Sequence, residues 1–170
     1  YFREKCILRQ KVPIIAKGVL IMNQQKELTS SKCHCINLRR AAGAVTDYYD
    51  RMLFGLGITL NQYSLLSNIQ KIQPCSVAEL ARLVRLERTT LVRNLKGLYA
   101  AEWIKNDADP GNRKSKIHLM KAGEDLIEKA KKQWIQAQEE VGACLGEEGI
   151  SHLTEYLLAL EQLNYQHKAK

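Results

Sequence analysis

The segment Cys33-His34-Cys35 places two thiols and an imidazole on three consecutive residues, a combination that can bind metal, supply a nucleophile or react with oxidants. Zinc sites usually take cysteines two to four residues apart together with a second pair elsewhere, and this spacing does not fit. A catalytic thiol needs a base within reach, whereas adjacent residues on a helix point about 100° apart. We therefore expect no metal site, no enzymatic activity and no cofactor.

Two interpretations of these thiols remain. Cys33 and Cys35 can pack as small hydrophobic side chains. Alternatively they sense oxidants, because the positive end of a helix favours the thiolate and Lys32 adds positive charge. Two residues apart on a helix, the two thiols face different directions and would bond to each other only with strain.

A second group of side chains has the chemistry of DNA recognition. Arg and Asn make bidentate hydrogen bonds to guanine and adenine edges, and Thr and Lys reach phosphates. In the stretch LERTTLVRNLKGL, residues 86–98, the side chains off the apolar face of a predicted helix are Arg88, Thr89, Thr90, Arg93, Asn94 and Lys96. Those expected on the outward side near the helix N-terminus are Arg88, Thr89, Arg93 and Asn94, with Glu87 as a cap or first-turn acid. An ordinary solvated helix face is the alternative.

A basic hairpin follows this helix. The sequence DPGN is a turn signal between two stretches of strand character, 103–106 and 116–120. Its tip carries Arg113-Lys114-Ser115-Lys116, and Arg side chains suit narrow minor grooves. Asp107 and Asp109 stand beside the tip and can support Arg113 through salt bridges. A turn that only promotes solubility is the alternative.

The elements that hold these residues are mostly helical. Thr59 is a candidate cap, and Ser76 with Glu79 forms a capping-box pattern. Ser76 is also a candidate DNA contact. Apolar spacing and turn signals predict a helix from about 38 to 52, a second over 60–72, and a short third helix that begins after Ser76 and ends at about 84. Three more are predicted over 87–102, over 121–145 and from 150 onward, and GEEG at 146–149 separates the last two. A short helix joined by a tight turn to a second helix is a helix-turn-helix unit, and the hairpin is its wing.

Charge and composition agree with a nucleic-acid partner. The net charge is +8, and residues 76–116 carry nine basic against five acidic side chains, whereas residues 117–170 carry six against nine. The five cysteines are odd in number, and no secretory signal is evident, so we expect reduced thiols and a cytoplasmic protein. The apolar run at 13–22 is too short for a membrane span and contains Lys17.

The N-terminal segment is expected to lie outside the fold. The first methionine is Met22, preceded by KGVLI, which can be encoded by a bacterial ribosome-binding sequence. We therefore interpret residues 1–21 as a translated leader with Met22 as the natural start, and the wider segment 1–31 as an extension. A genuine basic arm is the alternative.

Three stretches carry a resemblance to a known family. They are GITLNQYSLL, SVAELARLVRLERTTLVRNLKGL and DADPGNRKSKIHLMKAGEDLI. From about Leu38 to Leu163 the chain resembles the multiple-antibiotic-resistance regulator (MarR) family, with Asp109 and Arg113 as the wing pair. It departs from the family pattern at Glu102, where a glycine is usual, and in the wing region at Asn112, Lys114 and Met120.

The resemblance implies a winged helix-turn-helix domain with helical dimerisation arms. It places the DNA-binding domain at 59–120 and the dimerisation region at 32–58 and 121–166. The apolar seams of the outer helices also need a partner, and a second copy of the chain would supply it. The expected protein is a homodimeric transcriptional regulator, expected to be a repressor, of a pseudo-palindromic double-stranded DNA operator. A winged-helix protein-interaction module that has lost DNA binding is the alternative.

The resemblance also suggests how DNA binding would be relieved. If the arms close as in the family, Cys144 is the expected disulfide partner of Cys33 or Cys35, within or across the dimer. Some family members bind small aromatic effectors between the arms and the winged domain. By analogy, the candidate pocket residues are Tyr48, Tyr49, Arg51, Tyr63 and Trp103. Packing of these aromatic side chains in the core is the alternative.

Overall fold

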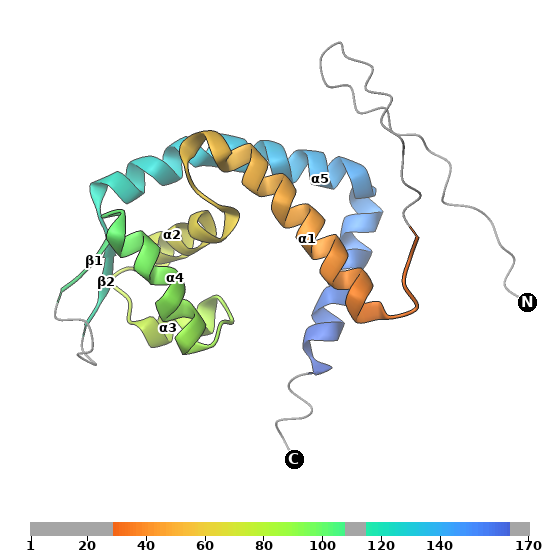
Figure 1. The fold of residues 1–170 in the computed structure, drawn as a ribbon, viewed down its shortest axis with the longest axis horizontal. Coiled ribbons are helices and arrows are strands. Elements are labelled where there is room, and N and C mark those ends of the chain that lie inside the picture. Colours follow the sequence, from red (N-terminus) through yellow and green to blue (C-terminus); the bar gives the residue numbers. More distant parts are fainter. Residues whose placement is uncertain (1–28, 108–114, 164–170) are drawn as a thin grey trace, which may run out of the picture. The chain divides into compact units, whose positions relative to one another are not determined.

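The computed structural model describes residues 29–107 and 115–163 of the 170-residue chain. Its elements are α1 (His34–Leu53), a 3₁₀ turn η1 (Phe54–Leu56), α2 (Leu60–Ile72), α3 (Val77–Leu83), α4 (Arg88–Ala100), β1 (Ile104–Asn106), β2 (Ile117–Leu119) and α5 (Lys121–Glu161) (Figure 1). The described residues form two compact units. One is Leu38–Val141, and the other joins the residues up to Asn37 with those from Gly142 onward. The predicted fold class, mostly helical with a small β-hairpin, is confirmed.

Helices α2 and α3 begin at the capping residues that the sequence predicted. The Thr59 side chain accepts a hydrogen bond from the Gln62 amide at 3.3 Å, and the Gln62 side-chain oxygen accepts one from the Thr59 amide at 2.9 Å. Ser76 and Glu79 make the same reciprocal pair at the start of α3. Both capping boxes satisfy amides that a helix start leaves without partners. Glu87 occupies the N-cap position of α4, but its side chain makes no capping hydrogen bond.

Two helix ends reverse the chain through residues other than glycine. After α3, Arg85 has φ of 54°, and the Leu86 amide donates to the Ala81 carbonyl at 3.1 Å. After α4, Glu102 has φ of 56°, and the Trp103 amide donates to the Leu98 carbonyl at 3.0 Å. Both are Schellman endings, in which a left-handed residue closes the helix and glycine is preferred. The glycine usual in the family at Glu102 therefore has a conformational reason.

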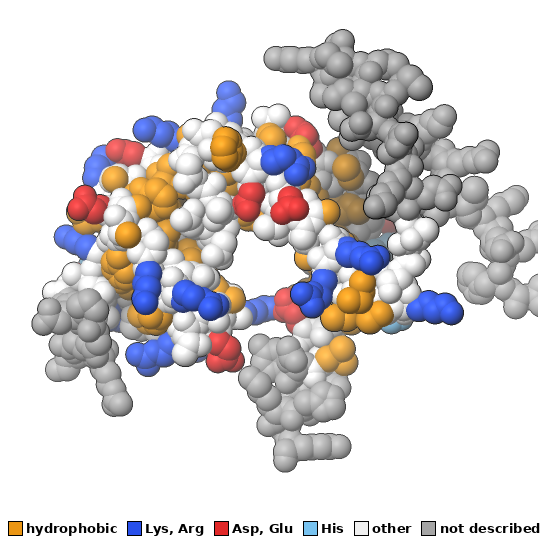
Figure 2. Space-filling model, in the orientation of Figure 1, with side chains coloured by type: hydrophobic (Ala, Val, Ile, Leu, Met, Phe, Trp, Pro, Cys, Tyr) orange, Lys and Arg blue, Asp and Glu red, His pale blue; other side chains and the backbone are white. Residues whose placement is uncertain are grey.

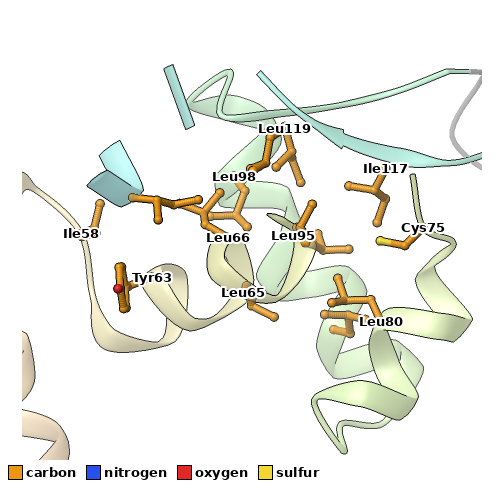
Figure 3. Packing of buried hydrophobic residues seen from close by; sticks show 14 of the residues in the cluster. Ile58, Tyr63, Leu65, Leu66, Cys75, Leu80, Leu95, Leu98, Ile117 and Leu119 are labelled. Carbon is orange, nitrogen blue, oxygen red and sulfur yellow. The ribbon is translucent and has the colours of Figure 1, made fainter. Parts of the chain in front are cut away.

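The core of the larger unit lies between α2, α3, α4 and the hairpin. Figure 3 shows Leu65 and Leu66 of α2 and Leu80 of α3 converging with residues of α4 and β2. The inward side chains of α4 are Leu91, Leu95 and Leu98, each at most 1% exposed. Burying a leucine side chain stabilises a fold by about 1.5–3 kcal/mol. The spacing of these leucines was a sequence prediction, and it orients the opposite side of α4 toward solvent.

The hairpin is shorter than predicted but joined to more of the fold. β1 and β2 have three residues each and pair antiparallel, with Ile104 opposite Leu119. On its other edge, the Ile117 amide donates to the Cys75 carbonyl at 2.7 Å, and the Cys75 amide donates back at 3.2 Å. The base of the hairpin is thus anchored on both sides of β2. Residues 108–114 lie outside the described part of the chain.

The long last helix is interrupted near the predicted site. α5 contains a kink at Gly146, whose φ of 70° and ψ of 167° are not helical. Beyond it, Ile150, Leu153, Leu157 and Leu160 expose between 40% and 43% of their surface. None of the described helices is long and apolar enough to span a membrane.

Candidate nucleic-acid interface

The outward side of α4 is polar and mostly basic. Figure 2 shows Lys and Arg side chains on the surface over α3 and α4. The predicted DNA-contact residues of α4 that are exposed are Arg88, Thr89, Arg93 and Lys96. Thr90 and Asn94 are partly buried. Among the predicted contacts, the exposed residues of α4 therefore offer three cations and one hydroxyl.

The first turn of α4 has no side-chain cap from Glu87. Because the Glu87 side chain makes no cap, it does not occupy the amides of this turn. Free amides and the helix dipole together favour a phosphate at such an end. Arg88 is the first helical residue and adds a full positive charge beside these amides.

Ser76, a predicted DNA contact, has partners within the protein. Its Oγ accepts the Glu79 amide at 3.2 Å and donates to the Glu79 carboxylate at 2.7 Å. The same carboxylate accepts the Lys116 ammonium at 2.9 Å. Hydrogen bonds from the Ser76 amide and hydroxyl, followed by Lys116, lower the pKa of Glu79 to about 2. We call Ser76, Glu79 and Lys116 the cap cluster, and it connects the start of α3 with the hairpin.

The hairpin base has a second polar pair that the sequence did not predict. The His118 Nε2 lies 2.7 Å from an Asp107 carboxylate oxygen. Asp107 therefore has a partner other than the predicted Arg113; Asp109, Arg113 and Lys114 all fall outside the described residues. On the α4 side, the Tyr99 hydroxyl donates to the Asn106 side chain at 2.7 Å. The hairpin is thus tied to both helices of the helix-turn-helix.

Comparisons with known proteins show which family this chain belongs to. The model of the MarR family matches residues 58–116. The transcriptional regulator MosR of M. tuberculosis has 30% sequence identity and a TM-score of 0.68, and the match covers 80% of this chain and 98% of MosR. The chain belongs to the MarR family of transcriptional regulators.

Other MarR-like structures agree with this assignment. MosR in complex with DNA matches at 32% identity and a TM-score of 0.63, covering 76% of this chain and 98% of that one. The S. aureus MepR–DNA complex has 17% identity and a TM-score of 0.65, covering 76% and 95%, and shows the same fold. A search of curated proteins finds no match.

The residues expected in a MarR-type effector pocket lie on α1, on α2 and just before β1. Tyr48 and Tyr49 at the end of α1 donate their hydroxyls to Glu140 and Gln138 of α5. The hydrogen bond from Tyr48 lowers the pKa of Glu140, and burial raises the pKa of Tyr49. These contacts fasten α1 to α5 within the larger unit.

The remaining pocket candidates have different surroundings. Tyr63 is buried beside Trp134, with ring centroids 5.9 Å apart, and Trp103 packs against the core. The Arg51 guanidinium lies 5.7 Å from the Tyr48 ring centroid. A shallow open pocket is lined by Asp47, Asp50, Arg51 and Phe54. Arg51 is therefore the one predicted pocket residue that lines this depression.

The thiols of this MarR-family chain divide by exposure. Cys33, Cys35 and Cys144 are exposed and free, whereas Cys75 is buried. Burial raises the pKa of the Cys75 thiol. Cys33 immediately precedes α1, and its carbonyl accepts the Asn37 amide at 3.2 Å. Within the described ranges, no cluster of three or more His, Cys, Asp or Glu is suited to a metal ion.

Proposed function

We propose that this protein is a homodimeric, sequence-specific repressor that binds double-stranded DNA. The observation that carries the proposal is the two-sided α4, with three buried leucines inward and Arg88, Arg93 and Lys96 outward. In winged helix-turn-helix proteins this helix enters the major groove. The MarR-family membership and the DNA complex of MosR support the same role.

Different residues of the interface would have different tasks. Arg88 and Arg93 can make bidentate hydrogen bonds to guanine edges, whereas Thr89 and Lys96 can bind phosphates. The hairpin would reach the minor groove with Arg113 and Lys114. Phosphate neutralisation releases counterions, so affinity should fall steeply with salt.

A second copy of the chain would complete the operator-binding unit. We assign dimerisation to the helical regions 32–58 and 121–166. The partly exposed leucines and isoleucine after Gly146 support this assignment, because apolar seams of this kind are normally buried against a partner. A twofold dimer would present two α4 helices to two half-sites about one helical turn apart.

We favour oxidation of thiols as the event that releases the repressor from DNA. Cys33, Cys35 and Cys144 are exposed to oxidant, and all three belong to the same compact unit. Peroxide oxidises a thiolate to a sulfenic acid and is itself reduced to water. A second thiol then attacks the sulfenic sulfur, and a disulfide forms as the hydroxyl group leaves as water. A bond formed in this unit would alter the proposed dimerisation region. A small aromatic effector is the second route that we propose, with Tyr48, Tyr49 and Arg51 as neighbouring candidates for its site.

Operator selection from random DNA, performed with reduced and with peroxide-treated protein, tests the proposal. We expect the reduced protein to enrich a pseudo-palindrome and the treated protein to enrich it less. Arg93→Ala should weaken binding and relax base preference, and Arg113→Ala should weaken binding to all sequences. Lys71→Ala on α2 removes one exposed positive charge from a residue that is not among the proposed DNA contacts, and it is the control for loss of charge. If no duplex binds even at low salt, the chain is instead a protein-interaction module.

A further inference from the structure

One side chain on the outward side of α4 is neither basic nor polar. Val92 exposes 42% of its surface, although the other large aliphatic residues of α4 are at most 1% exposed. Its side chain therefore contributes little to the core. A β-branched residue is also a weaker helix former than the Lys or Arg residues found elsewhere on this side.

The position of Val92 places it among the proposed DNA contacts. Thr89 and Lys96 are three residues before and four residues after it, the spacings that bring side chains together on a helix face. Arg88 lies four residues before it on the same side, and Arg93 is adjacent in sequence. A base edge approached by Arg88, Thr89 or Lys96 would also lie near the two methyl groups of Val92, whereas Arg93 points about 100° away.

The major groove offers one apolar group at this depth. Among the base edges exposed there, only thymine carries a methyl group, at C5, and aliphatic side chains contact it in DNA complexes. In a helix, valine strongly prefers a single side-chain rotamer, so its methyl groups are held in one place before binding. A rigid, exposed valine between cations is thus suited to this contact.

We propose that Val92 reads the C5-methyl group of a thymine in each operator half-site. The inference rests on the proposed DNA-binding function and adds a base preference to it. Arg88, Arg93 and Lys96 would set the position of α4 on the duplex, and Val92 would favour thymine over cytosine at one base pair. Burial of the thymine methyl between the two apolar surfaces would be the source of this preference.

Uracil scanning of the selected operator tests this contact directly. Replacing thymine by uracil deletes only the C5-methyl group, and each thymine of the operator is replaced in turn, together with its symmetry mate. Losing one buried methyl should weaken binding by about fourfold per half-site, or about sixteenfold for the symmetric pair. We expect the full-length protein to show this loss at one symmetric pair, and Val92→Ala to show none there.

Two further variants separate this contact from general effects. Leu83→Ala removes a similarly exposed aliphatic side chain, 46% exposed, from α3 rather than α4, and should keep the uracil profile of the parent. Val92→Thr keeps the branched shape with one methyl fewer and should reduce the loss at the same pair. Identical uracil profiles for the parent and Val92→Ala would overturn the inference and leave DNA binding intact. Absence of any duplex binding would overturn both.

Discussion

Gly123 holds the exit of the hairpin against the start of α5, and an added methyl group there has no space. A Cβ atom at this position would lie 2.4 Å from the Trp103 carbonyl oxygen and 3.2 Å from a Leu119 methyl carbon. The Trp103 carbonyl is itself fixed, because it accepts the Met120 amide at 2.9 Å. Gly123→Ala must therefore displace backbone rather than the end of a flexible side chain.

The size of the effect follows from this contact. A carbon normally approaches a carbonyl oxygen to about 3.3 Å, so the gap would have to open by about 0.9 Å. Overpacking a tight interior costs about 1–3 kcal/mol, and a hydrogen-bonded carbonyl as the obstacle places this case near about 3 kcal/mol. For a protein of this size, that loss lowers Tm by about 10 °C.

Urea denaturation of the parent and Gly123→Ala at equal protomer concentration measures the difference, since dimerisation would make stability depend on concentration. Gly97→Ala is the matched control, because the nearest atom to its new Cβ is Gln62 Nε2 at 3.8 Å. This control should gain about 0.5–1 kcal/mol, as expected for removing glycine from a helix interior. Equal midpoints for Gly123→Ala and the parent would refute the close approach on which the reasoning depends.

Three other outcomes are expected. Glu102→Gly should stabilise the fold by about 1 kcal/mol, because glycine adopts the left-handed ending of α4 without steric cost; thermal melting would detect it, and an unchanged Tm would contradict it. The pKa of Glu79 is lowered to about 2 in the folded protein, so its ionised form stabilises the fold above a pH of about 4.5, and this stability is lost as the pH falls toward 2. The urea midpoints of Glu79→Gln and the parent should therefore differ at pH 7 and converge at low pH. A difference that stays constant with pH would contradict this. Alkylation mapped by mass spectrometry should modify Cys144 in the native protein but Cys75 only after unfolding; equal rates would contradict the burial of Cys75.

Much of the fold could be predicted because its signals are local. The capping boxes at Thr59 and Ser76 each involve residues three apart, so the sequence alone contains both partners. The three leucines of α4 follow helical spacing, which determines their burial without knowledge of what they contact. The interruption of α5 at Gly146 was likewise visible in the run GEEG.

The polar contacts at the hairpin base required the tertiary structure. Glu79 and Lys116 are 37 residues apart, and only the pairing of β2 with the Cys75 segment brings them together. Asp107 and His118 come within reach through the strand register, which the turn signal DPGN did not specify. The contact between Tyr63 and Trp134 has the same origin, since the two residues are far apart in the sequence.

Lys116 shows how tertiary contacts give a basic residue a partner that the sequence did not reveal. In the sequence it counts among the cations of the hairpin, and we predicted that it binds DNA. In the structure its ammonium pairs with Glu79, while its carbonyl accepts the Asp107 amide at 3.1 Å. A phosphate would have to compete with a carboxylate that remains in place as part of the cap of α3. Lys116 therefore pairs with Glu79 in the free protein, and its predicted contact with a DNA phosphate would require this exposed ion pair to open.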